Sequence, residues 1–310
     1  MTTARIEPIG VLGVVQTPFT TTDEIDGPSL ERLVADALES EVDGFLVPAV
    51  ASENAFLSHE EKIALATRVS QITAGSVPVF WGAGSFDADA CVEIAQTAKR
   101  HEAAGLLVAV SPELFANQER IVPFFIRLSS QIGVPLMIQD WQPGGEGMRI
   151  EIIRELFEKV ERFKYLKVET IPAGPKYTAV LEATNGKLHV SGGWAVQQMI
   201  EALDRGVHAM IPECSMIRIY KRIDMLHRSG RRGEAKNLFE RLLPVLCFTN
   251  QQLDVSIRFF KQLLRRKGIF STEHDRLKSP PFDAHSERIA EELIERVLAL
   301  EEEIKREAPA

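Results

Sequence analysis

The sequence is poor in several features that mark large classes of protein. Its three cysteines are odd in number, lie far apart and show no CxxC spacing, which argues against a disulfide framework and against a zinc site. No stretch approaches the run of about eighteen apolar residues that a membrane span needs. The opening MTTARIEPIG has no basic region followed by a long apolar run, so we expect no secretion signal and a cytoplasmic protein without a membrane partner.

Positive charge is also scarce. The chain has 36 Lys and Arg against 44 Asp and Glu, a formal net charge of −8, and its basic clusters, such as RRK at 265–267, are short. This balance offers no electrostatic footprint for a polyanion, so we expect no nucleic-acid partner. The seven histidines are scattered, and we expect no metal site. A composition of 45% hydrophobic and 26% charged residues is that of an ordinary soluble globular protein.

Short apolar runs alternate along the chain with amphipathic helical segments. Helices at this spacing are the crossovers that parallel strands require, and strands covered on both faces read as continuous apolar runs. Eight such strand-then-helix units in roughly 250 residues predict a closed (β/α)8 TIM barrel. The predicted strands lie within 10–17, 42–50, 77–84, 105–112, 134–140, 164–170, 188–193 and 208–214.

An open, doubly wound sheet is the rival fold. That fold usually carries a glycine-rich phosphate fingerprint after its first strand, whereas TPFTTTDEID follows the first strand here. After about Gly230 the strand pattern stops, and the segments 233–247, 251–267 and 284–305 predict three further helices. We therefore predict a barrel over residues 1–231 and a C-terminal helical appendage over residues 232–310.

In (β/α)8 barrels the active site lies at the carboxyl ends of the strands. One such end carries Lys167 in the stretch FKYLKVET, and Glu169 projects to the same side because positions two apart in a strand share a face. Burial lowers the pKa of a lysine ammonium and leaves neutral amine to attack a carbonyl, so we predict that Lys167 forms a Schiff base. Alternatively, its stem packs in the wall while its ammonium reaches water or pairs with Glu169.

Several pieces of the chain, in order, resemble the dihydrodipicolinate synthase and N-acetylneuraminate lyase family of class I aldolases and dehydratases. They are TPFTTTDEID, VDGFLVP with SENAFLSHEEK, VPVFWGAGS, YLKVET and VSGG, and the tail LLRRKGIFSTEHDRLKSPPF looks like that of the sugar-acid members. The resemblance covers the chain essentially from end to end. It implies a barrel with a C-terminal helical domain, commonly a tetramer, in which Lys167 forms a Schiff base with the 2-oxo group of a pyruvate-like substrate.

Departures from the family pattern argue against dihydrodipicolinate synthase itself. Where the family usually has Gly-Thr-Thr-Gly-Glu after the second strand, this chain reads AVASE, so that Val50 and Ala51 replace the two threonines. Gln139 takes the place of the tyrosine that shuttles protons, and Leu114 that of a second tyrosine lent by a neighbouring subunit. Glu146 lies where an arginine would recognise the carboxylate of aspartate semialdehyde, and it has the wrong charge.

One branch of the family, which includes the 2-keto-3-deoxyarabonate dehydratases, is matched better, in MIQD, ASE and KVET. The resemblance implies that a Schiff base on Lys167 acidifies the C3 proton of the substrate and that the C4 hydroxyl leaves as water. Gln139 can orient a hydroxyl or a water but cannot act as an acid or a base. We expect Glu169 to be the base, with Glu213 as the second candidate; either glutamate could instead be a counter-ion of the lysine.

The prediction is therefore a lyase acting on a small 2-oxo acid, with dehydration of a 2-keto-3-deoxy sugar acid favoured. Two alternatives stay open: a pyruvate-dependent aldolase or retro-aldolase on the same lysine, and a barrel that binds a 2-oxo acid without converting it. The covalent Schiff base replaces any cofactor, and the expected assembly is a homotetramer or a dimer. The predicted catalytic residues are Lys167, Glu169 and Gln139, and the predicted substrate-binding residues are Ala51, Ser52, Glu53, Asp140, Gly192 and Glu213.

Overall fold

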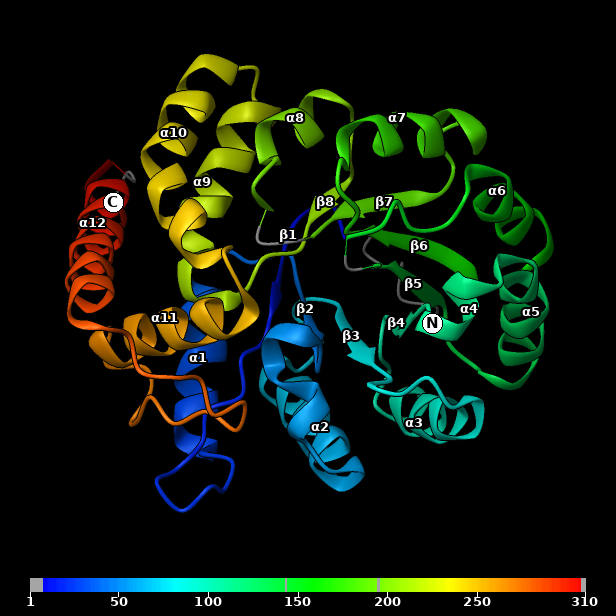
Figure 1. Ribbon diagram of the computed structural model, residues 1–310, viewed down its shortest axis with the longest axis horizontal. Helices are drawn as coiled ribbons and strands as arrows, with labels where there is room; N and C mark the ends of the chain where they lie inside the picture. Colours follow the sequence, from blue (N-terminus) through cyan, green and yellow to red (C-terminus); the bar gives the residue numbers. More distant parts are fainter. Residues whose placement is uncertain (1–7, 143, 194–195, 308–310) are drawn as a thin grey trace.

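The computed structural model describes residues 8–142, 144–193 and 196–307. Its eight parallel strands pair in sequence order, and β8 pairs with β1, so that the sheet closes into a barrel (Figure 1). The predicted (β/α)8 barrel is thereby confirmed. The strands are β1 Gly10–Val14, β2 Gly44–Val47, β3 Val79–Gly82, β4 Gly105–Ala109, β5 Leu136–Asp140, β6 Phe163–Val168, β7 His189–Gly192 and β8 Ala209–Met210.

A layer of helices surrounds the barrel (Figure 1). Between β4 and the longer helix that follows it, Ser111 caps an additional short helix, Pro112–Ala116. No helix in the described part of the chain is long and apolar enough to cross a membrane. The helices of this layer are α1 Gly27–Glu39, α2 His59–Thr73, α3 Ala88–Arg100, α4 Pro112–Ala116, α5 Ile121–Gln131, α6 Ile150–Lys159, α7 Gly174–Ala183, α8 Met199–Asp204 and α9 Ile217–Arg228.

Polar residues at the helix starts explain where the first helices begin. The Asp26 side chain accepts a hydrogen bond from the Ser29 backbone N–H at 3.2 Å, and a proline lies in the first turn of α1. Ser58 and Glu61 form a reciprocal capping box at the start of α2. These side chains satisfy backbone donors that a helix leaves unpaired, and so fix where α1 and α2 start after their strands.

Side chains fill the interior of the barrel. Leu12, Leu46, Phe80 and Met137, from different strands, are fully buried in one small cluster, against which Tyr165 packs from β6. A larger cluster contains the side chains packed between the strands and the helices. Because alternate residues of a strand share a face, the residues two positions beyond this interior layer face the mouth of the barrel.

The C-terminal helices α10 Arg232–Thr249, α11 Leu253–Arg266 and α12 Ala284–Glu307 lie on one side of the barrel, next to α9 and α1 (Figure 1). Their buried side chains belong to the same large cluster as those beneath the barrel helices. Lys267, just after α11, contacts both Asp36 of α1 and Glu301 of α12 at 3.1 Å. The helical appendage thus shares a continuous core with the barrel, while the domain boundary at residue 231 stays a prediction.

Candidate active site

Lys167 lies near the carboxyl end of β6, at the mouth of the barrel. It stands in register with Gln139 of β5 and with Ser191 of β7, so the three residues share one face of the sheet. Two positions earlier on β5 and β6 lie Met137 and Tyr165, which pack in the barrel interior. Lys167 and Gln139 therefore point into the barrel, each with only 3% of its surface exposed.

Glu169 connects these two side chains. Its carboxylate lies 3.1 Å from the Lys167 ammonium and accepts a hydrogen bond from the Gln139 amide. The Glu169 side chain is 9% exposed, and its backbone N–H donates to the Asp140 carbonyl at 3.0 Å. The structure thus brings together the three predicted catalytic residues, with a proton acceptor in direct contact with the lysine.

Two glycines, the last residue of β7 and the one after it, leave room for this arrangement. A Cβ on Gly193 would lie 2.2 Å from a Glu169 carboxylate oxygen, and one on Gly192 would lie 2.6 Å from the Tyr177 hydroxyl. Tyr177, on α7, is 1% exposed, and burial together with the nearby Glu169 and Glu201 charges raises the pKa of its phenol. Gly192 is therefore needed for close packing, and it brings a protonated phenol next to the site.

A cavity of about 300 Å³ adjoins this cluster at the Gln139 side chain. Its walls come from the ends of β2 to β5, from the loops that follow them and from the C-terminal region. The side chain of Gln139 both lines the cavity and binds Glu169, so a molecule in the cavity would lie beside the lysine cluster. Lining residues from these regions include Val50, Phe86, Ala109, Trp141 and Leu277.

The first turn after β2 forms one wall of the cavity. Ala51 lies in the 3-10 helix η1 Val50–Ser52 and packs against the cluster inside the barrel. The Ser52 hydroxyl donates to the Val15 carbonyl at 2.5 Å and accepts from the Ala49 backbone N–H at 2.9 Å. Because these bonds use the hydroxyl within the protein, Ser52 shapes the turn, and its contact with a substrate stays a prediction.

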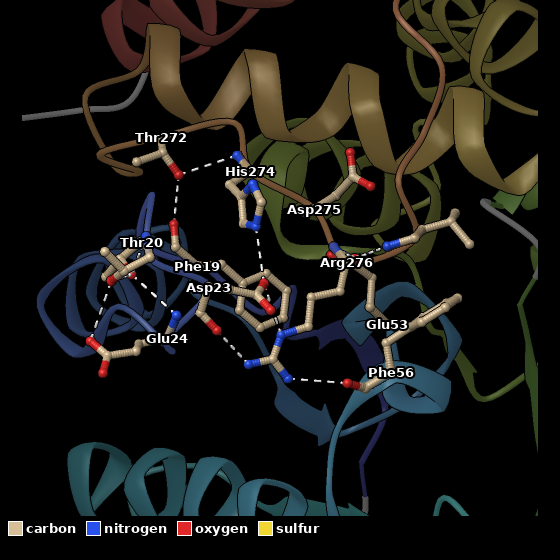
Figure 2. A network of polar contacts seen from close by, with 12 residues as sticks. Phe19, Thr20, Asp23, Glu24, Glu53, Phe56, Thr272, His274, Asp275 and Arg276 are labelled. Atoms are coloured by element: carbon tan, nitrogen blue, oxygen red, sulfur yellow. Dashed lines mark hydrogen bonds and ion pairs between the residues drawn. The ribbon is translucent and has the colours of Figure 1, made fainter.

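Glu53 is likewise used within the protein. It has a left-handed backbone, with φ of 57°, and its buried carboxylate pairs with Lys261 of α11. The same carboxylate accepts hydrogen bonds from the backbone N–H groups of Arg276 and Leu277, at 2.7 and 3.1 Å (Figure 2). Non-glycine residues seldom adopt this backbone conformation, so these contacts hold it in place. Glu53 therefore ties the cavity wall to the C-terminal region, and its contact with a substrate stays a prediction.

The Arg276 side chain strengthens this tie. Its guanidinium pairs with Glu61 at 2.7 Å. It also bonds to Asp23, donates to the Phe56 carbonyl and lies 4.4 Å from the centre of the Phe19 ring (Figure 2). Planar, bidentate contacts of this kind suit arginine. The segment 271–278 is thereby fixed across the loop after β1 and the turn after β2, and it places Leu277 in the cavity wall.

Asp140 follows Gln139 on β5 and therefore faces the opposite side, toward the helices. Its buried carboxylate pairs with Lys176 at 2.6 Å and accepts from the Met148 backbone N–H at 2.8 Å. Burial raises the pKa of Asp140, against the opposing effect of the Lys176 charge. Lys176 also donates to the Glu146 carbonyl at 2.5 Å. Asp140 thus organises the loop after β5, and its contact with a substrate stays a prediction.

Glu213 lies at the end of β8, where it accepts hydrogen bonds from Gln16 at 2.7 Å and from the Ser215 backbone N–H at 2.5 Å. Burial raises its pKa to about 6. The other carboxylate oxygen has no hydrogen-bond partner among the described residues. Its described contacts are thus with the turns after β1 and β8, whereas Glu169 contacts the lysine, which favours Glu169 as the base. In the described part of the chain, no group of His, Cys, Asp or Glu could hold a metal ion.

The fold agrees with the comparison to known proteins. The model of the dihydrodipicolinate synthetase family matches residues 7–298, nearly the whole chain. The chain belongs to this family. Membership confirms the family resemblance and makes the protein a lyase of the dihydrodipicolinate synthetase family.

Relatives within the dihydrodipicolinate synthetase family carry more than one name. L-2-keto-3-deoxyarabonate dehydratase of Azospirillum brasilense is 25% identical, over 91% of this chain and 92% of that protein. A 4-hydroxy-tetrahydrodipicolinate synthase of Kineococcus radiotolerans is 27% identical, over 86% of each chain. The crystal structure of dihydrodipicolinate synthase from Rhodopseudomonas palustris superposes with a TM-score of 0.86 at 24% identity, covering 95% of this chain and all of that one.

Three residues of this family member that matter for the site lie outside the predicted set. Tyr177 lies in a helix, where its pattern is that of an ordinary packed residue, although tyrosine occurs only three times in the chain. Lys261 and Arg276 lie in the C-terminal region, which was predicted only as helices and a tail. For Arg276, a signal was available in the match of LLRRKGIFSTEHDRLKSPPF to the tails of family members, whereas Lys261 lies just before that stretch.

Proposed function

We propose that this member of the family is a Schiff-base-forming lyase of a small 2-oxo acid, with Lys167 as the nucleophile. The observation that carries the proposal is the contact between the buried Lys167 ammonium and the Glu169 carboxylate, at the barrel mouth and beside the cavity. An amine must lose a proton before it attacks a carbonyl, and Glu169 is placed to accept it. The reaction needs no cofactor, because the lysine itself carries the substrate.

The proposed reaction is the dehydration of a 4-hydroxy-2-oxo acid. The Lys167 amine adds to the C2 carbonyl and water leaves, which gives an iminium ion that withdraws electrons from C3. Glu169 then removes a C3 proton, and the C4 hydroxyl departs with a proton as water. Hydrolysis consumes one water, frees the lysine and releases an unsaturated 2-oxo acid, so that one water is lost overall.

Gln139 favours Glu169 as the proton carrier in this scheme. An amide does not exchange protons as a tyrosine does, but its N–H can hold the Glu169 carboxylate in place. The name of the Azospirillum relative supports dehydration, with a 2-keto-3-deoxy sugar acid as the first substrate to test. Retro-aldol cleavage to pyruvate would begin with the same iminium ion. Assembly as a homotetramer or a dimer stays a prediction, which light scattering of the purified protein would test.

Borohydride trapping tests the proposal. The folded protein is incubated with pyruvate or with 2-keto-3-deoxyarabonate, reduced, and weighed both intact and as peptides. We expect an adduct on Lys167, which Lys167→Met abolishes and Lys164→Met, the matched change at an exposed position of the same strand, retains. The mass of the trapped sugar-acid adduct shows whether water or a carbon fragment was lost. Folded protein without any adduct would refute the lyase and leave a 2-oxo acid-binding barrel.

A further inference from the structure

We propose that the substrate carries an apolar group beyond C4, such as an alkyl chain or an aromatic ring. The inference rests on the proposed function, because it assigns the cavity next to Lys167 to the distal part of the 2-oxo acid. A cavity of about 300 Å³ is at the small end of ligand sites, sufficient for one compact substituent in addition to the oxo acid.

The wall of the cavity is mainly apolar. Apolar side chains from four parts of the chain line the cavity: Phe56 after β2, Phe86 after β3, Trp141 after β5 and Ile257 on α11. Leu277 closes the wall from the segment 271–278. Among the described lining residues, polar side chains come only from Glu53, Asn54, Ser85 and Gln139.

Three of these four polar side chains already have partners within the protein. The Glu53 carboxylate pairs with Lys261 and accepts hydrogen bonds from two backbone N–H groups. The Gln139 amide donates to Glu169, and the Ser85 hydroxyl accepts from the Asp87 backbone N–H at 3.0 Å. The hydroxyl groups of a sugar acid would lose their hydrogen bonds to water in this cavity and form few new ones with the protein. An apolar substituent makes no hydrogen bonds to water, so its burial has no such cost.

The chemistry is the same for both kinds of substrate. A 4-hydroxy-2-oxo acid with an apolar group on C4 forms the same iminium ion on Lys167. Loss of water gives the 3,4-unsaturated 2-oxo acid, and retro-aldol cleavage would give pyruvate and an apolar aldehyde, so atoms balance on either route. The cavity discriminates between substrates by the group attached to C4, not by the reacting atoms.

The test compares substrates that differ only beyond C4. The purified protein, residues 1–310, is incubated with one of three compounds. They are 2-keto-3-deoxyarabonate, 4-hydroxy-2-oxopentanoate, which lacks the terminal hydroxyl of the first, and 4-hydroxy-2-oxo-4-phenylbutanoate. Borohydride trapping on Lys167 is followed together with kcat/KM for product formation. We expect the phenyl compound to exceed the sugar acid in kcat/KM by about 100-fold. Homologues with longer alkyl groups should gain about fourfold for each methylene that the cavity buries.

A substitution in the cavity wall gives a second test of the proposal. Leu277→Asn should lower the ratio of kcat/KM for the phenyl compound to that for the sugar acid by about tenfold. Leu298→Asn, at a half-buried leucine of α12 away from the cavity, should leave the ratio unchanged and controls for stability. If kcat/KM for the sugar acid equals or exceeds that for the phenyl compound, and adducts still form on Lys167, the proposal of an apolar substrate is wrong but the lyase stands. Adducts from none of the compounds would overturn the lyase as well.

Discussion

The buried pair of Glu53 and Lys261 gives the sharpest prediction for stability. The two side chains are 2% and 1% exposed as residues, so removing one charge leaves the other without its counter-ion away from water. Breaking such a pair typically costs about 3 to 5 kcal/mol. In Glu53→Gln, Lys261 keeps a hydrogen bond to the His274 carbonyl at 2.7 Å and its place 4.5 Å from the Phe19 ring centre. We therefore expect a loss of about 3 kcal/mol, the lower end of that range.

The loss should also depend on pH. Burial already lowers the pKa of Lys261, and without the Glu53 charge that pKa falls further. Where the pH exceeds the pKa of the folded state but not that of the unfolded chain, the folded protein binds fewer protons, so its stability rises with pH. Guanidinium unfolding at pH 6 and at pH 9 measures both effects. The difference in the free energy of unfolding between Glu53→Gln and the parent protein should be smaller at pH 9 than at pH 6.

A double-mutant cycle decides whether the pair itself is responsible. Glu53→Gln together with Lys261→Met should cost clearly less than the sum of the single changes, because no charge is left buried. The matched control is the exposed pair Lys236–Glu240 of α10, where the same changes should alter stability little. Additive losses in the buried pair, or a loss for Glu53→Gln below about 1 kcal/mol, would refute the reasoning.

Three further predictions concern single positions. Glu213 has a pKa of about 6 in the folded protein, against an ordinary value of 4.5. The free energy of unfolding should therefore fall by about 2 kcal/mol as the pH rises from below the ordinary pKa to above the folded one. Glu213→Gln should abolish this fall in unfolding measurements. Gly193→Ala should push Glu169 away from the lysine and lower kcat, whereas Gly233→Ala, with no atom within 4 Å of its added Cβ, should leave kcat unchanged. Asp140→Asn should loosen residues 144–148, seen as faster limited proteolysis there; unchanged cleavage would contradict its role in ordering the loop.

The sequence predicts the barrel well because buried parallel strands leave a plain signal. Seven of the eight strands lie within a predicted apolar run, and β6 begins one residue before its run; Lys167 is conspicuous because a charge interrupts such a run. Glu169 follows from the alternation of side chains along the strand, and Gln139 from its place at a neighbouring strand end. These residues were predictable because their relation depends on local geometry and strand order.

The roles of Ser52, Glu53 and Asp140 were less predictable, because a polar residue at a strand end does not reveal its partner. Glu53 binds the backbone of Arg276, 223 residues further along the chain. Lysine and arginine in a helical or tail segment normally reach solvent, so nothing in their local pattern indicates that Lys261 is buried. Such pairs are properties of the tertiary fold, and the contacts of these three residues with a substrate stay predictions.

The position of the segment 271–278 has a consequence for how the protein is made. All eight strands leave the ribosome before the part of the chain that supplies Ile257, Leu277 and the partners of Glu53. A chain that ended before residue 253 would contain Lys167 and all eight strands but would lack one wall of the cavity. The selection among substrates that we propose therefore depends on the part of the chain that is synthesised after the barrel.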